Sequence, residues 1–146
     1  MSRDRQLMKK EVEMKLSFLM AVLFRIFQVS AFISPPFRRK VREKEVRLVM
    51  KSADNKVSRT FLFERGKIRS KRGEIPDSGC RLIWKRPGVG AKIMVEIASG
   101  RPKAIEGAII RGHLMLEGDA VSIKWFLETI QMLRSIYLGK RVKKAA

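Results

Sequence analysis

The chain has 146 residues, enough for one domain with a sizeable core but cramped for two. Its 33 Lys and Arg residues against 14 Asp and Glu residues give a formal net charge of +19, which attracts polyanions such as nucleic acid or an anionic membrane. Because 45% of the residues are hydrophobic, the chain is not a disordered basic tail. A single cysteine excludes an internal disulfide and favours a reducing, cytoplasmic location.

The N-terminal part of the chain, residues 1–36, reads as an apolar helix that Pro35 and Pro36 terminate. Residues 16–33 are almost continuously apolar and long enough to raise the question of a membrane span. They also contain a narrow polar stripe at helical spacing, made of Ser17, Ala21, Arg25 and Gln28. The stripe favours a helix that packs on the core or lies at a membrane interface over one that spans the membrane. We expect a packed helix, with a membrane-interfacial helix and a true span as alternatives.

A basic cluster follows the two prolines, and its simplest interpretation is a solvated linker. Alternating apolar and polar residues then predict four strands, at residues 46–51, 57–64, 65–71 and 80–85. Residues 53–56 and the pair Arg65-Gly66 are typical of hairpin turns. Basic residues occupy every second position from Arg65 to Lys71, so we expect a sheet with one basic, solvated face and one apolar face covered by helices.

Two short helices are predicted next, at residues 90–99 and 104–110. Gly100 and Gly112 follow them, and a glycine at this position closes a helix at little conformational cost. Residues 113–117 then alternate as a strand that places Leu114 and Leu116 on one face.

A long amphipathic helix completes the predicted elements. Gly118 supplies a turn and Asp119 an N-cap. The polar residues Lys124, Glu128, Gln131 and Ser135 recur at helical spacing. They leave an apolar face made of Ile123, Phe126, Leu127, Ile130, Leu133 and Tyr137. We expect Gly139 to end the helix and residues 140–146 to form a basic tail.

The sequence offers few groups for catalysis, and we expect a protein that is not an enzyme. His113 is the single histidine, at the start of a predicted strand, where a surface or hydrogen-bonded role is expected rather than that of a general base. Cys80 precedes the inward-facing Leu82 and is expected to be a small buried hydrophobe. One Cys and one His do not make a zinc site, and no nucleotide-binding loop is present, so we expect no metal and no cofactor.

The order of these segments resembles the sterol carrier protein type 2 family of lipid-binding domains. The resemblance rests on the glycine-ended helix before residue 100, on residues 104–110, on Gly112-x-Leu114-x-Leu116-x-Gly118-Asp119 and on the amphipathic C-terminal helix. Upstream, residues 64–68, Pro76-Asp77 and residues 80–85 follow in the order that the family uses. The similarity covers roughly residues 41–138, so we divide the chain into the N-terminal helix, a lipid-binding domain at residues 37–139 and the tail.

The resemblance implies an α/β structure of the α+β kind, with a five-stranded mixed sheet covered on one face by helices. Between sheet and helices the family holds an apolar cavity for an acyl chain, a sterol or another lipid. Residues expected to line it are Met94, Ile97, Ile105, Ile109, Leu114, Leu116, Trp125, Phe126 and Ile130, each of which also suits ordinary core packing. Tyr137 and Leu138 are placed to gate it, and in bacteria similar domains assist the assembly of isoprenoid quinones.

Two features depart from the family pattern: the apolar first helix and the strongly positive charge. Both fit docking on an anionic membrane, because each Lys or Arg near such a surface contributes about 1 kcal/mol. The candidate contacts are Arg38, Arg39, Lys40, Arg42, Lys140, Arg141, Lys143 and Lys144. The rival hypothesis is nucleic-acid binding by the basic sheet face, although the aromatic residues that stack on bases are predicted to point inward. The sequence leaves the oligomeric state open.

Overall fold

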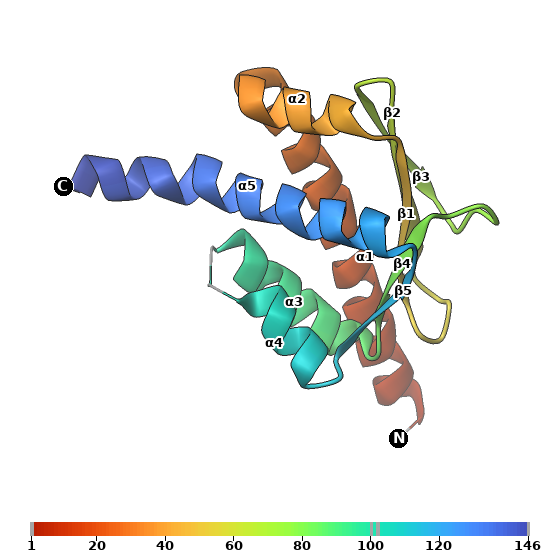
Figure 1. Ribbon diagram of the computed structural model, residues 1–146. Helices are drawn as coiled ribbons and strands as arrows, with labels where there is room; N and C mark the ends of the chain where they lie inside the picture. Colours follow the sequence, from red (N-terminus) through yellow and green to blue (C-terminus); the bar gives the residue numbers. More distant parts are fainter. Residues whose placement is uncertain (1, 100, 102, 146) are drawn as a thin grey trace.

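The computed structural model describes residues 2–99, 101 and 103–145, and the side chains of residues 3–99, 101 and 103–137. These residues form one five-stranded sheet and five helices (Figure 1). In chain order the elements are α1 (Ser2–Ile33), α2 (Pro35–Glu43), β1 (Val46–Ser52), β2 (Ser58–Glu64), β3 (Lys67–Arg72), β4 (Cys80–Trp84), α3 (Pro87–Ala98), α4 (Ala104–Ile110), β5 (Leu114–Gly118) and α5 (Ala120–Ala145).

The sheet is mixed, with strand order β3-β2-β1-β4-β5. Strand β1 runs antiparallel to β2 and parallel to β4, and the outer pairs β2–β3 and β4–β5 are antiparallel. Figure 1 shows the helices gathered on one side of this sheet. The predicted mixed sheet, covered on one face by helices, is therefore confirmed.

The hairpin turns lie where the sequence predicts them. Asn55 adopts φ +64° between β1 and β2, and Arg65 and Gly66 adopt φ +51° and +77° between β2 and β3. Gly118 has φ +113°, and a Cβ there would collide with the Gly79 carbonyl and lie 2.8 Å from the Cα of Cys80. Glycine is required at this position, because β5 passes so close to the start of β4.

Helix ends follow the prediction only in part. Helix α3 starts at Pro87, three residues before the predicted start, because proline fits the first helical position. Gly112, at φ +77°, follows the end of α4 as predicted, whereas Gly100 lies outside the described residues. The predicted helix end at Gly139 is wrong, since α5 continues to Ala145. A glycine within a helix costs only about 0.5–1 kcal/mol relative to alanine and does not force an end.

Pro35 and Pro36 both end one helix and begin the next. Helix α1 stops at Ile33 as predicted, but the basic cluster interpreted as a linker forms α2. The Ser34 hydroxyl accepts a hydrogen bond from the Phe37 backbone N–H at 3.4 Å, and the prolines occupy the first turn, where a missing N–H is harmless. The Arg38 guanidinium donates to the Ala31 and Phe32 carbonyls at 2.9 and 2.7 Å, so it caps the C-terminus of α1.

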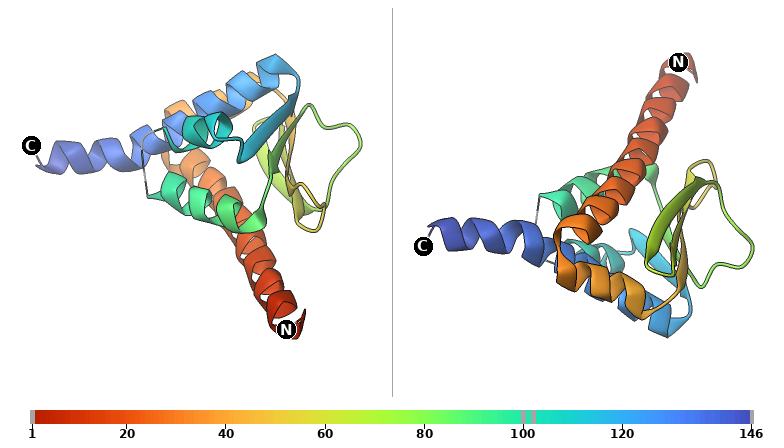
Figure 2. Two further views of the ribbon diagram at one scale, coloured as in Figure 1. Left: turned by 90° about the horizontal axis from the view of Figure 1, so that it is seen from below. Right: turned by 90° about the horizontal axis from the view of Figure 1, so that it is seen from above.

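Helix α1 is part of the core through one face. Leu16, Met20 and Phe27 on this face are buried, whereas Arg25 is exposed. Helix α1 is also long and apolar enough to cross a membrane, and 28% of its most apolar 18-residue segment is buried in the structure. The N-terminal part of α1 extends past the other helices (Figure 2). In the structure one face of α1 is thus packed on the core, and a membrane-interfacial or spanning role of this helix stays a prediction.

The core is centred on the ring of Phe27, which is fully buried. Phe37 of α2 stacks with it at 6.3 Å between centroids, and Phe61 and Phe63 of β2 meet it edge-on at 6.1 and 5.4 Å. Phe126 of α5 completes the group at 6.4 Å. Aromatic pairs at these separations and angles stabilise a core beyond their buried area. Three other elements, α2, β2 and α5, therefore meet on one side chain of α1.

Asp119 caps the N-terminus of α5, as the sequence predicts. Its carboxylate accepts hydrogen bonds from the backbone N–H groups of Val121 and Ser122, both at 3.3 Å, and from the Ser122 hydroxyl at 2.9 Å. The Ser122 hydroxyl bond, followed by the Val121 backbone bond, holds the pKa of Asp119 below its ordinary value of 3.8. A carboxyl whose pKa is lower in the folded state stabilises the protein above the unfolded-state pKa, and that stabilisation is lost as pH falls through the folded-state value.

We therefore expect Asp119→Asn to keep much of the cap but to lose this pH dependence. Above about pH 4 the variant should be less stable than the parent protein, and the difference should shrink as the pH falls further. Thermal unfolding followed by circular dichroism across this range measures the effect. A difference in melting temperature that does not change with pH would contradict the assigned cap.

Candidate functional site

The residues predicted to line a cavity come together on the helix-covered face of the sheet. Met94, Ile105, Leu114, Trp125, Phe126 and Ile130 belong to one buried cluster. Ile97 and Leu116 are partly buried against this cluster, whereas Ile109 on α4 is outside it and 37% exposed. The structure thus brings together apolar side chains of α3, α4, β5 and α5 and leaves Ile109 at the surface. That these side chains enclose a ligand stays a prediction.

Polar contacts fix helix α5 over this cluster. The Trp125 indole N–H donates to the Lys40 backbone carbonyl at 3.2 Å, which ties α5 to α2. Tyr137 and Ser30 share a hydrogen bond between their hydroxyls at 2.9 Å, which ties α5 to α1. Of the two predicted gating residues, Tyr137 is held in this contact, and the side chain of Leu138 lies outside the described residues.

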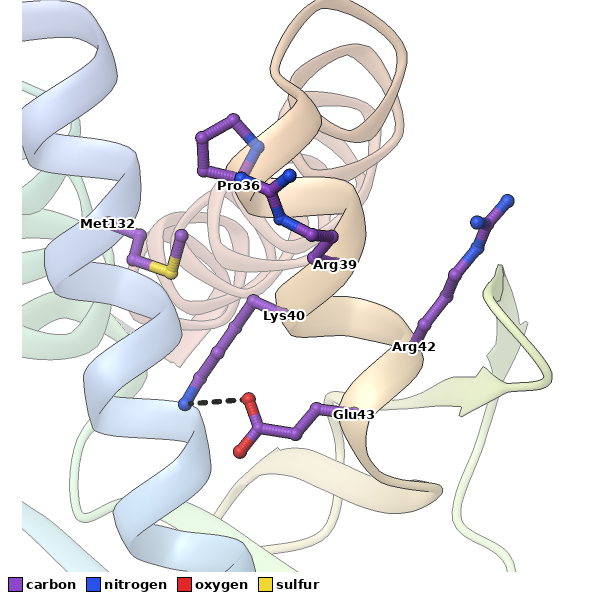
Figure 3. A pocket seen from close by; sticks show the side chains of 6 residues that line it. All are labelled: Pro36, Arg39, Lys40, Arg42, Glu43 and Met132. Carbon is purple, nitrogen blue, oxygen red and sulfur yellow. Dashed lines mark ion pairs between the residues drawn. The ribbon is translucent and has the colours of Figure 1, made fainter.

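An open pocket of about 410 Å³ lies between α2 and α5. Its lining residues, drawn in Figure 3, are Pro36, Arg39, Lys40, Arg42, Glu43 and Met132. The Lys40 ammonium pairs with Glu43 at 3.6 Å and with Glu128 at 3.3 Å. Within the described part of the chain, Arg39 and Arg42 form no ion pair, and both side chains are exposed. This pocket combines unpaired guanidinium groups with apolar contacts.

The sequence identified part of this basic surface. Arg39, Lys40 and Arg42 were predicted contacts for a membrane or polyanion, whereas Arg38 is half-buried and occupied in capping α1. Four further predicted contacts, Lys140, Arg141, Lys143 and Lys144, are on the last turns of α5, where the structure does not describe side chains. The lining residue Met132 was missed, although it follows Glu128 by one helical turn and so faces α2 as Glu128 does.

The predicted basic face of the sheet is exposed along the edge strand β3 and at Arg47 of β1. Lys67, Arg69 and Lys71 of β3 project into solvent, as the alternation predicts. Near the centre of the sheet, Val49 and Thr60 on this same outer face are buried. The alternation alone did not reveal that the segment after β3 covers the middle of this face.

Glu74 anchors this covering segment. Its carboxylate pairs with the Lys51 ammonium at 3.0 Å and with the Arg81 guanidinium at 3.2 Å. The Thr60 hydroxyl donates to the Gly73 carbonyl at 2.8 Å, which holds the start of the segment on β2. One carboxylate thereby pairs with two cations of the outer face and offsets one of their two charges.

The residues considered for catalysis show no catalytic arrangement. Cys80 is fully buried, as predicted, and burial raises the pKa of its thiol to about 12, so the thiol stays protonated at neutral pH. His113 is half-buried next to the start of β5. Among the residues that the structure describes, no three His, Cys, Asp or Glu side chains gather closely enough to hold a metal ion.

From Met14 to Ile33 the exposed side of α1 is mostly apolar, whereas residues 3–11 are exposed and mostly polar or charged. The exposed hydrophobic side chains of the helix are Leu7, Met8, Met14, Phe18, Val29, Phe32 and Ile33, which we call the α1 stripe. Arg25 lies within the stripe, and Lys10 and Lys15 are exposed beside it. The polar stripe predicted from the sequence, which includes Arg25, runs along one flank of the α1 stripe. Large exposed apolar surfaces on otherwise folded proteins mark contacts with membranes or other proteins.

Comparison with solved structures identifies the fold. The chain matches "UbiJ-SCP2 Ubiquinone synthesis protein" with a TM-score of 0.58 at 15% identity, over 77% of this chain and 88% of that one. It also matches the sterol carrier protein domain 2 of Helicoverpa armigera with a TM-score of 0.53 at 11% identity, over 77% and 86% of the two chains. No family model and no curated protein matches the sequence. The fold of this chain is that of the sterol carrier protein type 2 domains.

Proposed function

We propose that this protein binds or transfers a hydrophobic ligand between the inner face of its sheet and helices α3, α4 and α5. The observation that carries the proposal is the convergence of apolar side chains from these helices and β5, in a fold shared with sterol carrier domains. Moving lipid surface out of water supplies about 25 cal/mol per Å² and needs no catalytic group. We therefore propose a binding role without a chemical step.

The ligand class is a lipid, a fatty acyl chain, a sterol or an isoprenoid quinone intermediate. A solved structure with this fold is named as a ubiquinone synthesis protein, which supports the quinone variant. Mass spectrometry of lipids that co-purify with the protein identifies the natural occupant. Recovery of no lipid, together with no binding of a fluorescent fatty acid, would refute the proposal.

A bulky side chain at the site should weaken this binding. We expect Ile97→Trp on α3 to lower the affinity for a fluorescent fatty acid about tenfold, which corresponds to about 1.4 kcal/mol. Ile97 is only partly buried, so the larger ring can occupy ligand space without disrupting the core. The matched control is Val95→Trp on the same helix, where the side chain is exposed and binding should not change. Equal affinities for the two variants would place the ligand elsewhere.

We further propose that the protein is cytoplasmic and docks peripherally on anionic membrane. The net charge of +19, the unpaired Arg39 and Arg42 and the apolar α1 stripe all support this location. An anionic surface attracts the cations, and the apolar side chains enter the headgroup region. A protein docked in this way would take up or release its ligand at the membrane, which is the source of the lipid.

Nucleic-acid binding is the less supported alternative. The exposed cations of β3 suit phosphate contacts, but among the described residues the exposed aromatic side chains Phe18, Phe32 and Tyr137 lie on α1 and α5. Base stacking requires aromatic side chains among the cations. Electrophoretic mobility shifts with single-stranded and duplex DNA test it, and binding that falls steeply with salt would support it.

A further inference from the structure

The two tryptophans of the chain differ in one respect. Both are buried, Trp84 at the end of β4 and Trp125 on α5. The Trp125 indole N–H donates to the Lys40 carbonyl, as described above. The Trp84 indole N–H has no acceptor among the described residues, although the side chain is only 1% exposed. Trp84 therefore keeps a hydrogen-bond donor in the interior without a partner.

A buried donor without an acceptor is unfavourable, because the N–H has lost its bond to water and gained none. Buried indole N–H groups usually find a partner for this reason. A phenylalanine at this position would supply most of the same apolar surface without a donor. An unpaired group of this kind in a native interior therefore calls for a specific explanation.

Trp84 lies between two elements of the proposed ligand site. In the sheet it pairs directly with Leu114 of β5, one of the predicted lining residues. On its other side α3 approaches so closely that a Cβ on Gly90 would lie 2.8 Å from the Trp84 Cγ. One turn further along α3 is Met94, a second predicted lining residue. The indole therefore adjoins the region where we place the ligand.

We propose that the Trp84 indole N–H is the donor that holds the polar end of the ligand. This inference rests on the proposed function and narrows the ligand to an apolar molecule that carries an uncharged oxygen acceptor, such as a carbonyl. The buried cluster around Trp84 is apolar, and Lys51, a buried cation, projects from the opposite face of the sheet. A charged ligand end would lose its hydration at Trp84 without gaining a counter-ion, so a neutral acceptor fits this position best.

The test compares two probes of equal length, 2-heptadecanone and heptadecane, which differ in one carbonyl. Each displaces the neutral dye Nile red from the full-length protein. We expect Trp84→Phe to weaken the ketone about five- to tenfold and to leave the alkane within twofold, because only the ketone accepts a hydrogen bond. Trp125→Phe removes the hydrogen bond to the Lys40 carbonyl instead, and it should change the affinities for the ketone and the alkane by the same factor.

A second readout does not depend on the stability of a variant. The unmodified protein has two tryptophans and therefore gives two indole N–H signals in a ¹⁵N correlation spectrum, which Trp84→Phe assigns. The ketone should shift the Trp84 signal downfield and the alkane should not, whereas the Trp125 signal, whose N–H is bonded to the Lys40 carbonyl, should respond alike to both probes. Equal shifts with both probes, or equal weakening of both by Trp84→Phe, would overturn the role of Trp84 while leaving hydrophobic binding intact. Failure of both probes to displace Nile red would instead refute the proposed function and this inference together.

Discussion

Replacing Phe27 with alanine is expected to lower the free energy of unfolding by about 3–5 kcal/mol. The ring is fully buried and meets aromatic rings of α2, β2 and α5, so its removal leaves a cavity at the junction of four elements. Small domains are stable by only about 5–15 kcal/mol in total, so this loss is a large part of the whole. Urea unfolding followed by far-ultraviolet circular dichroism measures it.

The matched control is Phe32→Ala on the same helix. The Phe32 side chain is 82% exposed, and its removal should change the free energy of unfolding by less than about 0.5 kcal/mol. If the two variants were equally stable, α1 would not be packed in the core in solution. The comparison therefore tests whether one face of α1 is packed in the core, which a membrane-spanning α1 would not be.

Replacing Phe18 and Phe32 together with serine should weaken binding to anionic vesicles about 30-fold. These two rings are 66% and 82% exposed and are the largest side chains of the α1 stripe. Burying a phenylalanine fully is worth about 1.5–3 kcal/mol, so partial insertion of both rings contributes about 2 kcal/mol in total. Flotation with vesicles of phosphatidylglycerol and phosphatidylcholine measures the partition coefficient.

Two controls separate the apolar and the electrostatic contributions. The Arg39→Gln, Arg42→Gln variant keeps the stripe and should lose affinity for anionic vesicles while binding neutral ones as before. The double serine variant should unfold at the same urea concentration as the parent protein, since both rings are exposed. If the serine variant bound vesicles as the parent protein does, the α1 stripe would not be the membrane contact. If sedimentation showed a dimer that the serine substitutions dissociate, the α1 stripe would instead contact a second copy of the chain. Mutual repulsion of chains that each carry +19 charges opposes such a dimer.

The fold was largely predictable because its strands and turns are local. Alternating residues located the strands, and the Arg65-Gly66 turn placed β2 against β3. The run from Gly112 to Asp119 located β5 and the cap of α5, since a strand, a glycine and an N-cap each leave a local signature. That the five strands form one mixed sheet came from the resemblance to a known family, and the strand order came only from the structure.

The features that the sequence did not reveal depend on residues far apart in the chain. The outer face of the sheet is covered because Glu74 reaches Lys51 and Arg81, and no alternation pattern records such a contact. The start of α2 is an exception, because the Ser34 cap and the two prolines in the first turn are a local signature that we interpreted only as a break. The missing acceptor of Trp84 could not be predicted either. The alternation of the strand predicts that the side chain points inward but not which groups lie near its indole N–H.

The contact between Ser30 and Tyr137 has a consequence for synthesis on the ribosome. Ser30 of α1 is synthesised before Tyr137 of α5, its hydrogen-bond partner, which follows 107 residues later. At about 5–20 residues per second, translation of that interval takes roughly 5–20 s. During these seconds the emerging helix exposes both of its apolar faces, so a chaperone or a nearby bilayer meets the nascent chain before its own sheet is complete.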